Sequence, residues 1–428
     1  MSGEEAIEPA AGKRPPDAQE FTIRAVIAGM LVAAIIGGSY PYVVMKLGFG
    51  PNISVVSAFF GYLMLGILFK SFNRWENNIV QTAGTSAGQT AFLCVLMAAF
   101  DFLAQDPDLG FTMQLRPMQA FAWLTCAGAL GVFLAVPMRR HFVVDEKLAY
   151  PDGIAAAQTL IVLDSRGTEA RDVAKAMGVG TGLSAVMMIV REDARVLPAS
   201  MWRLPEMLAA PWASGPPLAV GISWSLLNLG SGMLVGMRIN TSMMIGMVTS
   251  WIVIGPMLHE RGIVEELTRR NVTLWVMWPA TGMLIAGGLT ALALRWKILV
   301  KTFRNLSGAA VGSEDFPTRW VIGGIVLSSL ALILVQRFML DMPVWMTIVA
   351  IIFTIPLMLV GLRVLGETNW GPISALSNMM QAVFGLIAPG NVAANMVASG
   401  VTGSVASESE GSCRTTRPGT SSGARRST

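Results

Sequence analysis

Long apolar stretches separated by short polar loops run through most of the chain. A helix needs about 20 mostly apolar residues to cross the hydrocarbon core of a bilayer. The pattern therefore predicts an all-α integral membrane protein, a polytopic helical bundle with about ten transmembrane spans. The predicted spans are 21–46, 52–70, 84–104, 117–138, 176–190, 216–237, 241–258, 272–294, 320–340 and 343–363, with a partial eleventh at 372–390.

The composition agrees with this class of protein. Of the 428 residues, 53% are hydrophobic and 14% are charged, whereas soluble domains carry roughly 25% charged residues. The net charge of +4 is small, and the charged residues lie in short clusters in the loops. We therefore expect no nucleic-acid partner. The cysteines Cys94, Cys126 and Cys413 show no paired spacing, which argues against a disulfide framework and a metal site. No cofactor is expected.

The basic loop residues predict the orientation, because Lys and Arg concentrate on the cytoplasmic side of a membrane. With the N-terminus inside, Arg139, Arg140 and the run Arg295–Arg304 all fall on that side. The loop His259–Arg270 then lies outside. Residues 1–20 are polar, acidic and unlike a signal peptide, which predicts a disordered cytoplasmic N-terminus. We expect the protein in the cell (inner) membrane.

Two intervals do not fit plain spans. Residues 76–89 are polar and small but lead directly into an apolar run, and 146–163 contain an apolar stretch too short to cross. Both fit re-entrant or broken helices, whose irregular backbone must be buried by protein or line a water-filled cavity. The spacing leaves an alternative open, with a cytoplasmic loop at 76–89 and a surface amphipathic helix at 146–163.

Two short strings of the sequence occur twice in the same order. Gly-Pro-Asn-Ile-Ser at 50–54 returns as Gly-Pro-Ile-Ser at 371–374, an offset of 321 residues. The string at Asn78–Gly84 returns at Asn395–Gly400, an offset of 317. This pattern predicts an internal repeat whose second copy starts at about 343 and is incomplete. Weak internal repeats are typical of secondary transporters, with the binding site where broken helices of the two halves meet.

Three segments resemble the oligopeptide transporter (OPT) family. They are the string Asn77–Gly84, the segment Tyr150–Gly153 with Ala155–Leu160, and the turn Gly50–Ser54. The resemblance covers roughly 21–407 and is nearer to the branch of yellow-stripe-like metal-chelate carriers. It implies proton-coupled uptake of short peptides or peptide-like metal chelates on a duplicated many-helix scaffold.

The candidate substrate path consists of side chains with amide, hydroxyl or phenol groups, and we expect its segment 77–89 to face 391–399 of the second copy. Amide and hydroxyl groups can form hydrogen bonds with the carbonyl and N–H groups of a peptide. The same side chains also form hydrogen bonds between helices, so both roles stay open. Tyr40 and Tyr42 flank a proline near the end of the first span. The sequence leaves two roles open for them, an aromatic belt at a kink in the helix or a gate. The candidates are Tyr40, Tyr42, Asn77, Asn78, Gln81, Thr82, Thr85, Ser86, Gln89, Gln158, Asn391 and Asn395.

Four acids lie nearest to the predicted membrane: Glu76, Asp101, Glu146 and Asp152. Carboxylates inside a bilayer are costly and usually mark ion or proton pathways. Each is therefore a candidate for proton coupling, and the pattern does not fix its depth. We expect the partners to be a small-molecule substrate, protons and the lipid bilayer, and the sequence leaves the oligomeric state open.

Two other functions compete with a secondary active transporter. A passive channel is compatible with the same spans. An intramembrane enzyme would need a nucleophile with its base, paired acids at depth or a metal motif, and the two distant histidines form none of these. No P-loop motif is present either. We therefore expect a transporter and not an enzyme, and the choice between peptide and chelate stays open.

The apolar pattern stops after Ser407. Residues 408–428 are rich in Ser, Gly, Arg and Thr, which predicts an aberrant polar tail behind a membrane domain at 21–407. One permitted coding of Ser412–Pro418, read one base earlier, gives Leu-Met-Gln-Asp-Tyr-Lys-Thr-Gly, which resembles OPT members at this point. We therefore expect a frameshifted, truncated form. The alternative is a short family member with a disordered cytoplasmic tail.

Overall fold

The computed structural model describes residues 21–48, 50–51, 53–69, 73–105, 111, 113–146, 148, 150–164, 168–190, 202–203, 221–222, 226–294, 318–368 and 371–421. The predicted N-terminal segment 1–20 and residues 422–428 lie outside this described part of the chain. The chain divides into two compact units, residues 1–173 with 285–428 and residues 174–284.

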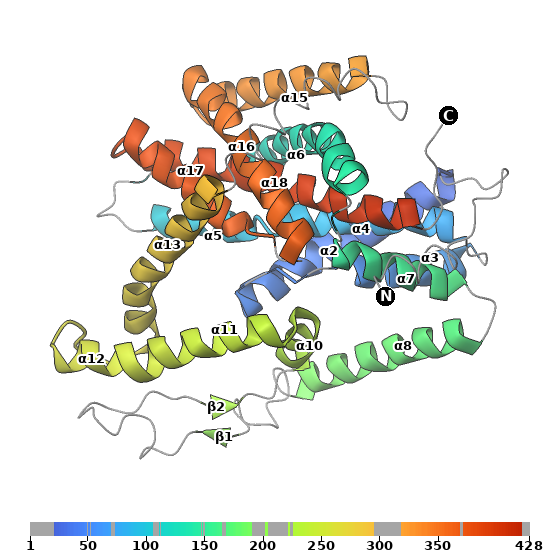
Figure 1. The fold of residues 1–428 in the computed structure, drawn as a ribbon, viewed down its shortest axis with the longest axis horizontal. Coiled ribbons are helices and arrows are strands. Elements are labelled where there is room, and N and C mark those ends of the chain that lie inside the picture. Colours follow the sequence, from blue (N-terminus) through green and yellow to red (C-terminus); the bar gives the residue numbers. More distant parts are fainter. Residues whose placement is uncertain are drawn as a thin grey trace. The chain divides into compact units, whose positions relative to one another are not determined.

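The first unit is built from helices (Figure 1). Its elements are α2 (Ile23–Leu47), α3 (Ser54–Leu68), α4 (Arg74–Ala91), α5 (Cys94–Ala104), α6 (Pro117–Arg139), the π-helical segment η2 (Arg140–Asp145), α7 (Pro151–Asp164), α15 (Thr318–Met339), α16 (Val344–Thr368), α17 (Ile373–Ile387) and α18 (Val392–Ser421).

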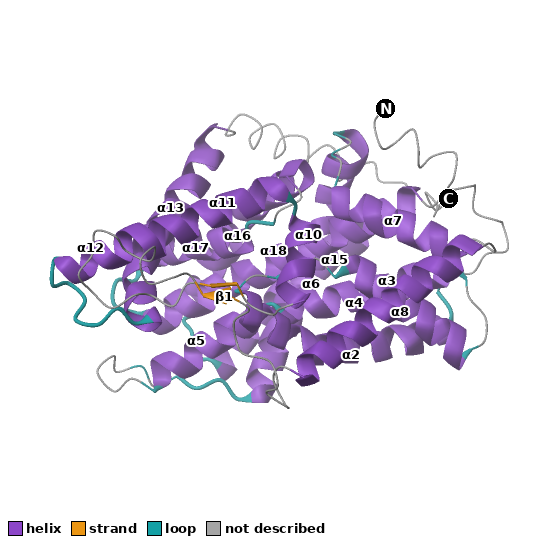
Figure 2. Ribbon diagram, turned by 90° about the horizontal axis from the view of Figure 1, so that it is seen from below, coloured by secondary structure: helices purple, strands orange, loops and turns teal. Residues whose placement is uncertain are grey.

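The second unit contains the short antiparallel strands β1 (Trp202–Arg203) and β2 (Gly221–Ile222) and further helices. These helices are α10 (Leu226–Val235), α11 (Met237–Met247), the π-helical segment η4 (Val248–Ile254) and α12 (Gly255–Glu260). Helix α8 (Thr168–Met188) begins in the first unit and α13 (Arg269–Leu294) ends in it. Helices dominate the described chain, as Figure 2 shows.

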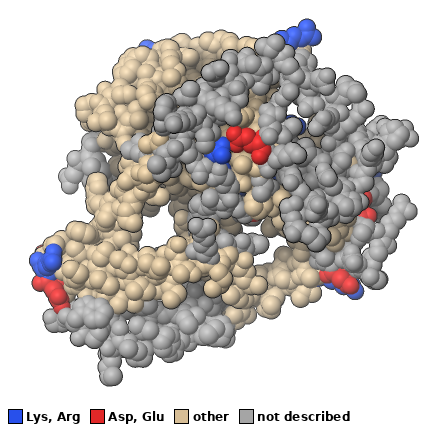
Figure 3. Space-filling view, viewed as in Figure 1, with Lys and Arg blue, Asp and Glu red and all other residues tan. Residues whose placement is uncertain are grey.

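The predicted class is confirmed: the chain is an all-α integral membrane protein. Within the described residues, six helices are long and apolar enough to cross a membrane: Ile23–Leu47, Arg74–Ala104, Pro117–Val143, Ile239–Glu260, Arg319–Met339 and Val344–Gly366. Large apolar side chains of these helices are exposed, for example Leu327 at 70% and Phe338 at 77%, as a lipid-facing surface requires. The described surface on the face in Figure 3 is mostly uncharged. The count of ten spans stays a prediction.

One predicted span differs clearly from the structure. The interval 216–237 contains the strand β2, and its helix α10 has only ten residues. Gly236 then adopts φ +86° and separates α10 from α11. A positive φ interrupts an α-helix and suits glycine, which has no Cβ. Hydropathy could not reveal this break, because the residues on either side of it are apolar.

Both unusual intervals contain a helix. Residues 76–89 lie in the continuous helix α4, which the side chain of Asn73 caps by accepting a hydrogen bond from the backbone N–H of Trp75 at 3.0 Å. A break at Phe92–Leu93 then separates α4 from α5. Of the interval 146–163, residues 151–163 lie in the 14-residue helix α7, which is too short to cross a bilayer. Because α7 packs against α3 and α18 with Ala156, Ala157 and Leu160 buried, it is not a surface helix.

The order of elements at the start of the first unit returns at its end. Helices α2 and α16 each have 25 residues, and α3 and α17 each have 15. A Gly-Pro pair precedes α3 and α17, and an asparagine precedes α4 and α18. The side chain of Asn391 accepts a hydrogen bond from the backbone N–H of Ala394 at 2.9 Å, as Asn73 does for α4. This agreement in length and capping supports the predicted repeat.

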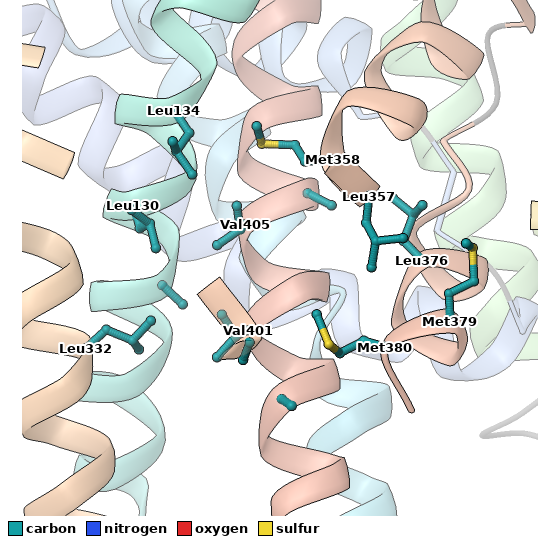
Figure 4. Packing of buried hydrophobic residues seen from close by; sticks show 14 of the residues in the cluster. Leu130, Leu134, Leu332, Leu357, Met358, Leu376, Met379, Met380, Val401 and Val405 are labelled. Carbon is teal, nitrogen blue, oxygen red and sulfur yellow. The ribbon is translucent and has the colours of Figure 1, made fainter. Parts of the chain in front are cut away.

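Helix α18 runs through the centre of the apolar core. Figure 4 shows Val401 and Val405 of α18 lying between Leu130 and Leu134 of α6 on one side and Met358 and Met380 on the other. Gly131 of α6 allows this close approach, because backbone atoms of Val405 occupy the space that a Cβ would need.

The predicted tail boundary at Ser407 is not a boundary of the packed structure. Helix α18 continues to Ser421, and residues 408–411, 413 and 414 are buried. The polar side chains remain in the interior because neighbouring helices supply hydrogen-bonding partners for several of them. The side chain of Ser409, for example, donates to the backbone oxygen of Gly131 at 2.8 Å. The frameshift itself stays a prediction.

Candidate functional site

Helix α4 places a line of polar side chains in the interior of the first unit. Asn77, Gln81, Thr85 and Gln89 recur at every fourth position, which puts them on one face of a helix, and all four are buried. The amide of Asn77 donates to the backbone oxygen of Ala58 on α3 at 3.0 Å. The hydroxyl of Ser57 donates to the backbone oxygen of Gln81, also at 3.0 Å. Part of this polar line therefore joins α4 to α3.

The C-terminal end of α4 meets the middle of α18. The hydroxyls of Ser86 and Thr90 donate to the two carboxyl oxygens of Glu408, at 2.7 and 2.5 Å. The hydroxyl of Ser407 donates to the side-chain oxygen of Gln89 at 2.8 Å and to its backbone oxygen at 3.0 Å. We call these five residues the α4–α18 junction. It brings the candidates Ser86 and Gln89 together in the core.

Under the predicted repeat, the junction joins residues at equivalent positions of the two copies. Gln89 and Ser407 are 318 residues apart, and so are Thr90 and Glu408. Asn77 and Asn395 are also 318 residues apart, one residue away from the pairing of Asn78 with Asn395 that the sequence strings predict. Both donate an amide N–H to the backbone of the preceding helix, at 3.0 and 3.1 Å. Around a two-fold axis, equivalent residues meet each other. These contacts fit a pseudo-two-fold axis through the junction.

Several side-chain amide oxygens in this region are buried and accept no hydrogen bond among the described residues. They belong to Asn77, Asn78, Gln81 and Asn395. A buried acceptor without a donor costs about 1–3 kcal/mol. The oxygen of Asn77 lies directly against Gly61, so close packing accounts for it. Asn78 and Gln81 offer acceptors that a ligand N–H group could use.

The contacts of the second half differ from the expected arrangement, in which 77–89 face 391–399. Asn395 donates to the backbone oxygen of Gln381 on α17, and the amide of Gln381 donates to the hydroxyl of Ser399 at 3.3 Å. The start of α18 therefore contacts α17, while α4 contacts residues 407 and 408. The offset of the repeat predicts this arrangement, because α4 and α3 contact each other at the equivalent positions.

The remaining path candidates lie elsewhere. Tyr40 is buried, and its hydroxyl donates to the backbone oxygen of Pro51 at 2.5 Å. Tyr42 is exposed and accepts a hydrogen bond from Lys46 at 3.3 Å. Gln158 is exposed on α7, and Asn391 caps α18. Thr82 is half-buried, and its hydroxyl donates to the backbone oxygen of Asn78 at 2.8 Å.

The four acids predicted for proton coupling are not brought together. Glu76 is buried and paired with Arg24 at 2.7 Å, and Thr22 also donates to it. Glu146 is paired with Arg363 at 2.7 Å and lies 3.2 Å from His141. Asp152 lies 3.9 Å from Arg414. Asp101 is exposed on α5. Three of these acids thus lie within 4 Å of a basic side chain.

Sequence reasoning missed two buried acids, Glu408 and Glu410, because it assigned both to the polar tail. Extending the repeat by its own offset would have found them. An offset of 318 residues aligns Glu408 with Thr90 and Glu410 with Phe92, both inside the predicted span 84–104. Among the residues that the structure describes, no three His, Cys, Asp or Glu side chains gather into a possible metal site.

Comparison with known proteins agrees with this architecture. The family model described as "OPT oligopeptide transporter protein" matches residues 20–414. The "Putative oligopeptide transporter" of Haemophilus influenzae is 26% identical over 314 residues, covering 69% of this chain and 46% of that protein. A Saccharomyces cerevisiae protein with the same description, YGL114W, is 22% identical over 524 residues, covering 90% of this chain and 71% of that protein.

A plant protein is similar over a shorter stretch. The "Metal-nicotianamine transporter YSL3" of Arabidopsis thaliana is 27% identical over 177 residues, covering 33% of this chain and 24% of that protein. The chain thus spans about half of the Haemophilus relative's length and a quarter of the Arabidopsis relative's. Because the family match covers most of the chain, including α4, the junction and Glu410, this protein belongs to the OPT oligopeptide transporter family.

Proposed function

We propose that this chain is a secondary active transporter that moves oligopeptides or peptide-like metal chelates across the membrane together with protons. The α4–α18 junction is the observation that carries this proposal. It places polar groups of two similar helix sets against each other inside an apolar bundle. Secondary transporters bind their substrates where such repeats meet. The relatives, which are described as oligopeptide and metal-nicotianamine transporters, support the two substrate classes.

We place the substrate path along the polar face of α4, from Asn78 towards the junction. Peptides and amino-acid-derived chelators carry N–H donors, and the oxygens of Asn78 and Gln81 are buried acceptors without a donor among the described residues. A ligand that donates to them would recover the free energy lost by their burial. Ser86, two turns after Asn78, and Gln89, two turns after Gln81, extend the path to α18.

We further propose that the protein lies in the cell (inner) membrane with its N-terminus in the cytoplasm, as the Lys and Arg distribution predicts. Proton coupling requires an ionisable group whose proton affinity changes during the transport cycle. Glu76 and Glu146 are already engaged in ion pairs, with Arg24 and Arg363, so we expect the coupling group among the other buried acids.

Uptake into proteoliposomes tests the proposal. The purified chain, and the Haemophilus relative as a positive control, are supplied with labelled tripeptides, tetrapeptides and iron–nicotianamine. We expect accumulation of one class of substrate above its equilibrium level when the outside is acidic, and loss of this accumulation with a protonophore. Downhill movement that ignores the proton gradient would instead indicate a channel and contradict the proposal.

A substitution tests the path. Asn78→Ala should reduce uptake severalfold, because it removes an acceptor for the substrate, while the amount of folded protein in the membrane stays unchanged. The matched control is Gln114→Ala, which shortens an exposed amide side chain in the loop before α6. Equal uptake by both variants at equal abundance would assign Asn78 to helix packing.

A further inference from the structure

The two halves of the repeat differ at one buried position. The 321-residue offset that relates α2 to α16 aligns Tyr40 with Gly361 and Gly50 with Gly371. The 318-residue offset that relates α4 to α18 aligns Phe92 with Glu410. An aromatic pair around a glycine in the first half therefore corresponds to a glycine and a carboxyl group in the second.

In the first half this position is packed with aromatic side chains. A Cβ atom on Gly50 would lie 2.7 Å from the ring of Phe92 and 2.9 Å from the hydroxyl of Tyr40. In the second half, a Cβ atom on Gly371 would collide with the carboxyl oxygen Oε2 of Glu410. A Cβ atom on Gly361 would lie 3.3 Å from Oε1. Both oxygens of Glu410 thus lie against the backbone of glycines on α16 and before α17.

Glu410 is fully buried, with 0% of its surface exposed. Neither of its carboxyl oxygens accepts a hydrogen bond among the described residues. Its neighbour Glu408 is in a different environment, because Ser86 and Thr90 donate to both of its oxygens. An ionised carboxylate without donors or counter-ion is very costly in the interior, and such a group takes up a proton instead.

No basic side chain forms an ion pair with Glu410 among the described residues, and Arg414 is the one cation whose charge attracts its carboxyl group. On α18, Arg414 lies one turn away and is 3.9 Å from Asp152 of α7, while Cys413 lies near Tyr150. Tyr150 donates its hydroxyl to the backbone oxygen of Leu362 at 3.0 Å. On α16, Arg363 pairs with Glu146, and α17 carries no charged residue. On α4 and α6, Glu76 pairs with Arg24 and Arg139 lies in the last turn.

We propose that Glu410 is a proton-binding site, that its carboxyl group is protonated in this conformation, and that its proton is the one coupled to transport. The proton-binding part rests on burial and contacts alone, and the coupling part rests on the proposed function. A metal cation fits less well, because Ca²⁺ takes six to eight oxygen ligands and Mg²⁺ takes six. Two oxygens of a single carboxyl group pressed against glycines do not supply that number.

The repeat gives a physical reason for coupling at this position. A neutral carboxyl group can pack where Phe92 packs in the first half, whereas an ionised one needs water or a cation. Release of the proton therefore favours a conformation in which α18 separates from Gly361 and Gly371. A ligand shifts an equilibrium only through its different affinity for the two states, and here the ligand is the proton.

Infrared spectroscopy of the purified chain in lipid tests the protonated state directly. Protonated carboxyl groups give a C=O stretching band that carboxylates and amides lack, and the band shifts in D₂O. We expect the Glu410→Gln variant to lose one component of this band. The control Asp341→Asn makes the same chemical change at an exposed acid and should keep the whole band. An unchanged band in Glu410→Gln would overturn the proposal.

A second measurement uses the unmodified protein, so it does not depend on how a variant folds. Dicyclohexylcarbodiimide reacts with protonated carboxyl groups in apolar surroundings, and mass spectrometry locates the adduct. We expect an adduct on Glu410 that decreases as the pH is raised. Labelling confined to other acids would overturn the assignment.

Transport separates this inference from the proposed function. With the peptide or chelate that the wild type accumulates, Glu410→Gln should lose proton-driven accumulation but retain exchange of labelled for unlabelled substrate. Accumulation by Glu410→Gln that still follows the proton gradient would refute the coupling role while the proposed function stands. A wild type that moves no substrate yet shows the infrared component would refute the proposed function and support the proton site.

Discussion

The contact between α6 and α18 can be tested with a single methyl group. Gly131 lies where the two helices touch, and a Cβ atom there would lie 2.7 Å from the backbone oxygen of Val405 and 3.0 Å from its Cα. Both atoms belong to the backbone, so no side-chain rotation relieves the clash. Gly131→Ala must therefore push α18 away from α6.

The size of the effect follows from three contributions. Overpacking of a well-packed interior costs about 1–3 kcal/mol. The displacement also weakens the hydrogen bond from Ser409 to the backbone oxygen of Gly131, which is worth roughly 0.5–1.5 kcal/mol. Alanine regains about 1 kcal/mol relative to glycine inside a helix. We expect a net loss of roughly 1–3 kcal/mol.

The measurement is reversible unfolding in mixed detergent micelles, with helicity as the signal. The matched control is Gly38→Ala on α2, because Gly38 is exposed and a Cβ atom there has no neighbour within 4 Å. The Gly38→Ala variant should have the stability of the wild type or be more stable by up to about 1 kcal/mol. Equal stability of the two variants would refute the close α6–α18 contact, and with it the position of the junction.

Three further predictions concern the ion pair, the junction and the topology. Arg24→Ala should destabilise the protein by roughly 1–3 kcal/mol in the same unfolding assay, because it leaves the buried carboxyl group of Glu76 without this hydrogen-bond donor. Adding Glu76→Gln should restore most of the loss. Ser86→Ala should cost roughly 1–3 kcal/mol by removing a donor to Glu408, and a double-mutant cycle with Glu408→Gln should show coupling between the two residues. Cysteine placed at the exposed residue Glu265 should react with an impermeant maleimide added outside the cell; reaction only after permeabilisation would contradict the predicted topology.

The class of this protein and its family could be predicted from the sequence. Transfer of a helix into a bilayer depends on the summed hydropathy of neighbouring residues, which a single chain displays directly. An internal repeat could also be predicted, because the Gly-Pro turns at 50–54 and 371–374 and the strings that start at Asn78 and Asn395 keep their order. The polar helix α4 was recognised as unusual, since the string Asn77–Gly84 interrupts the apolar pattern.

Local pattern was misleading where a polar segment is buried by distant parts of the chain. Residues 408–414 look like the start of a polar tail, yet they continue α18 through the core. Glu408 is held by hydroxyls 322 and 318 residues away, on α4. The sequence of residues 408–414 by itself does not reveal that they are buried, because Ser86 and Thr90 come near Glu408 only when the chain folds.

The tertiary structure alone decided which acids have partners. Glu76, Glu146 and Asp152 are similar to Glu410 as residues in a sequence, but three of them lie near a basic side chain and the fourth lies between two glycines. The protonation state of a buried carboxyl group depends on the donors and charges within a few ångströms. Sequence determined that this protein spans a membrane and contains acids near it, and the packing of α18 against α16 and α17 decided which acid is left without a partner.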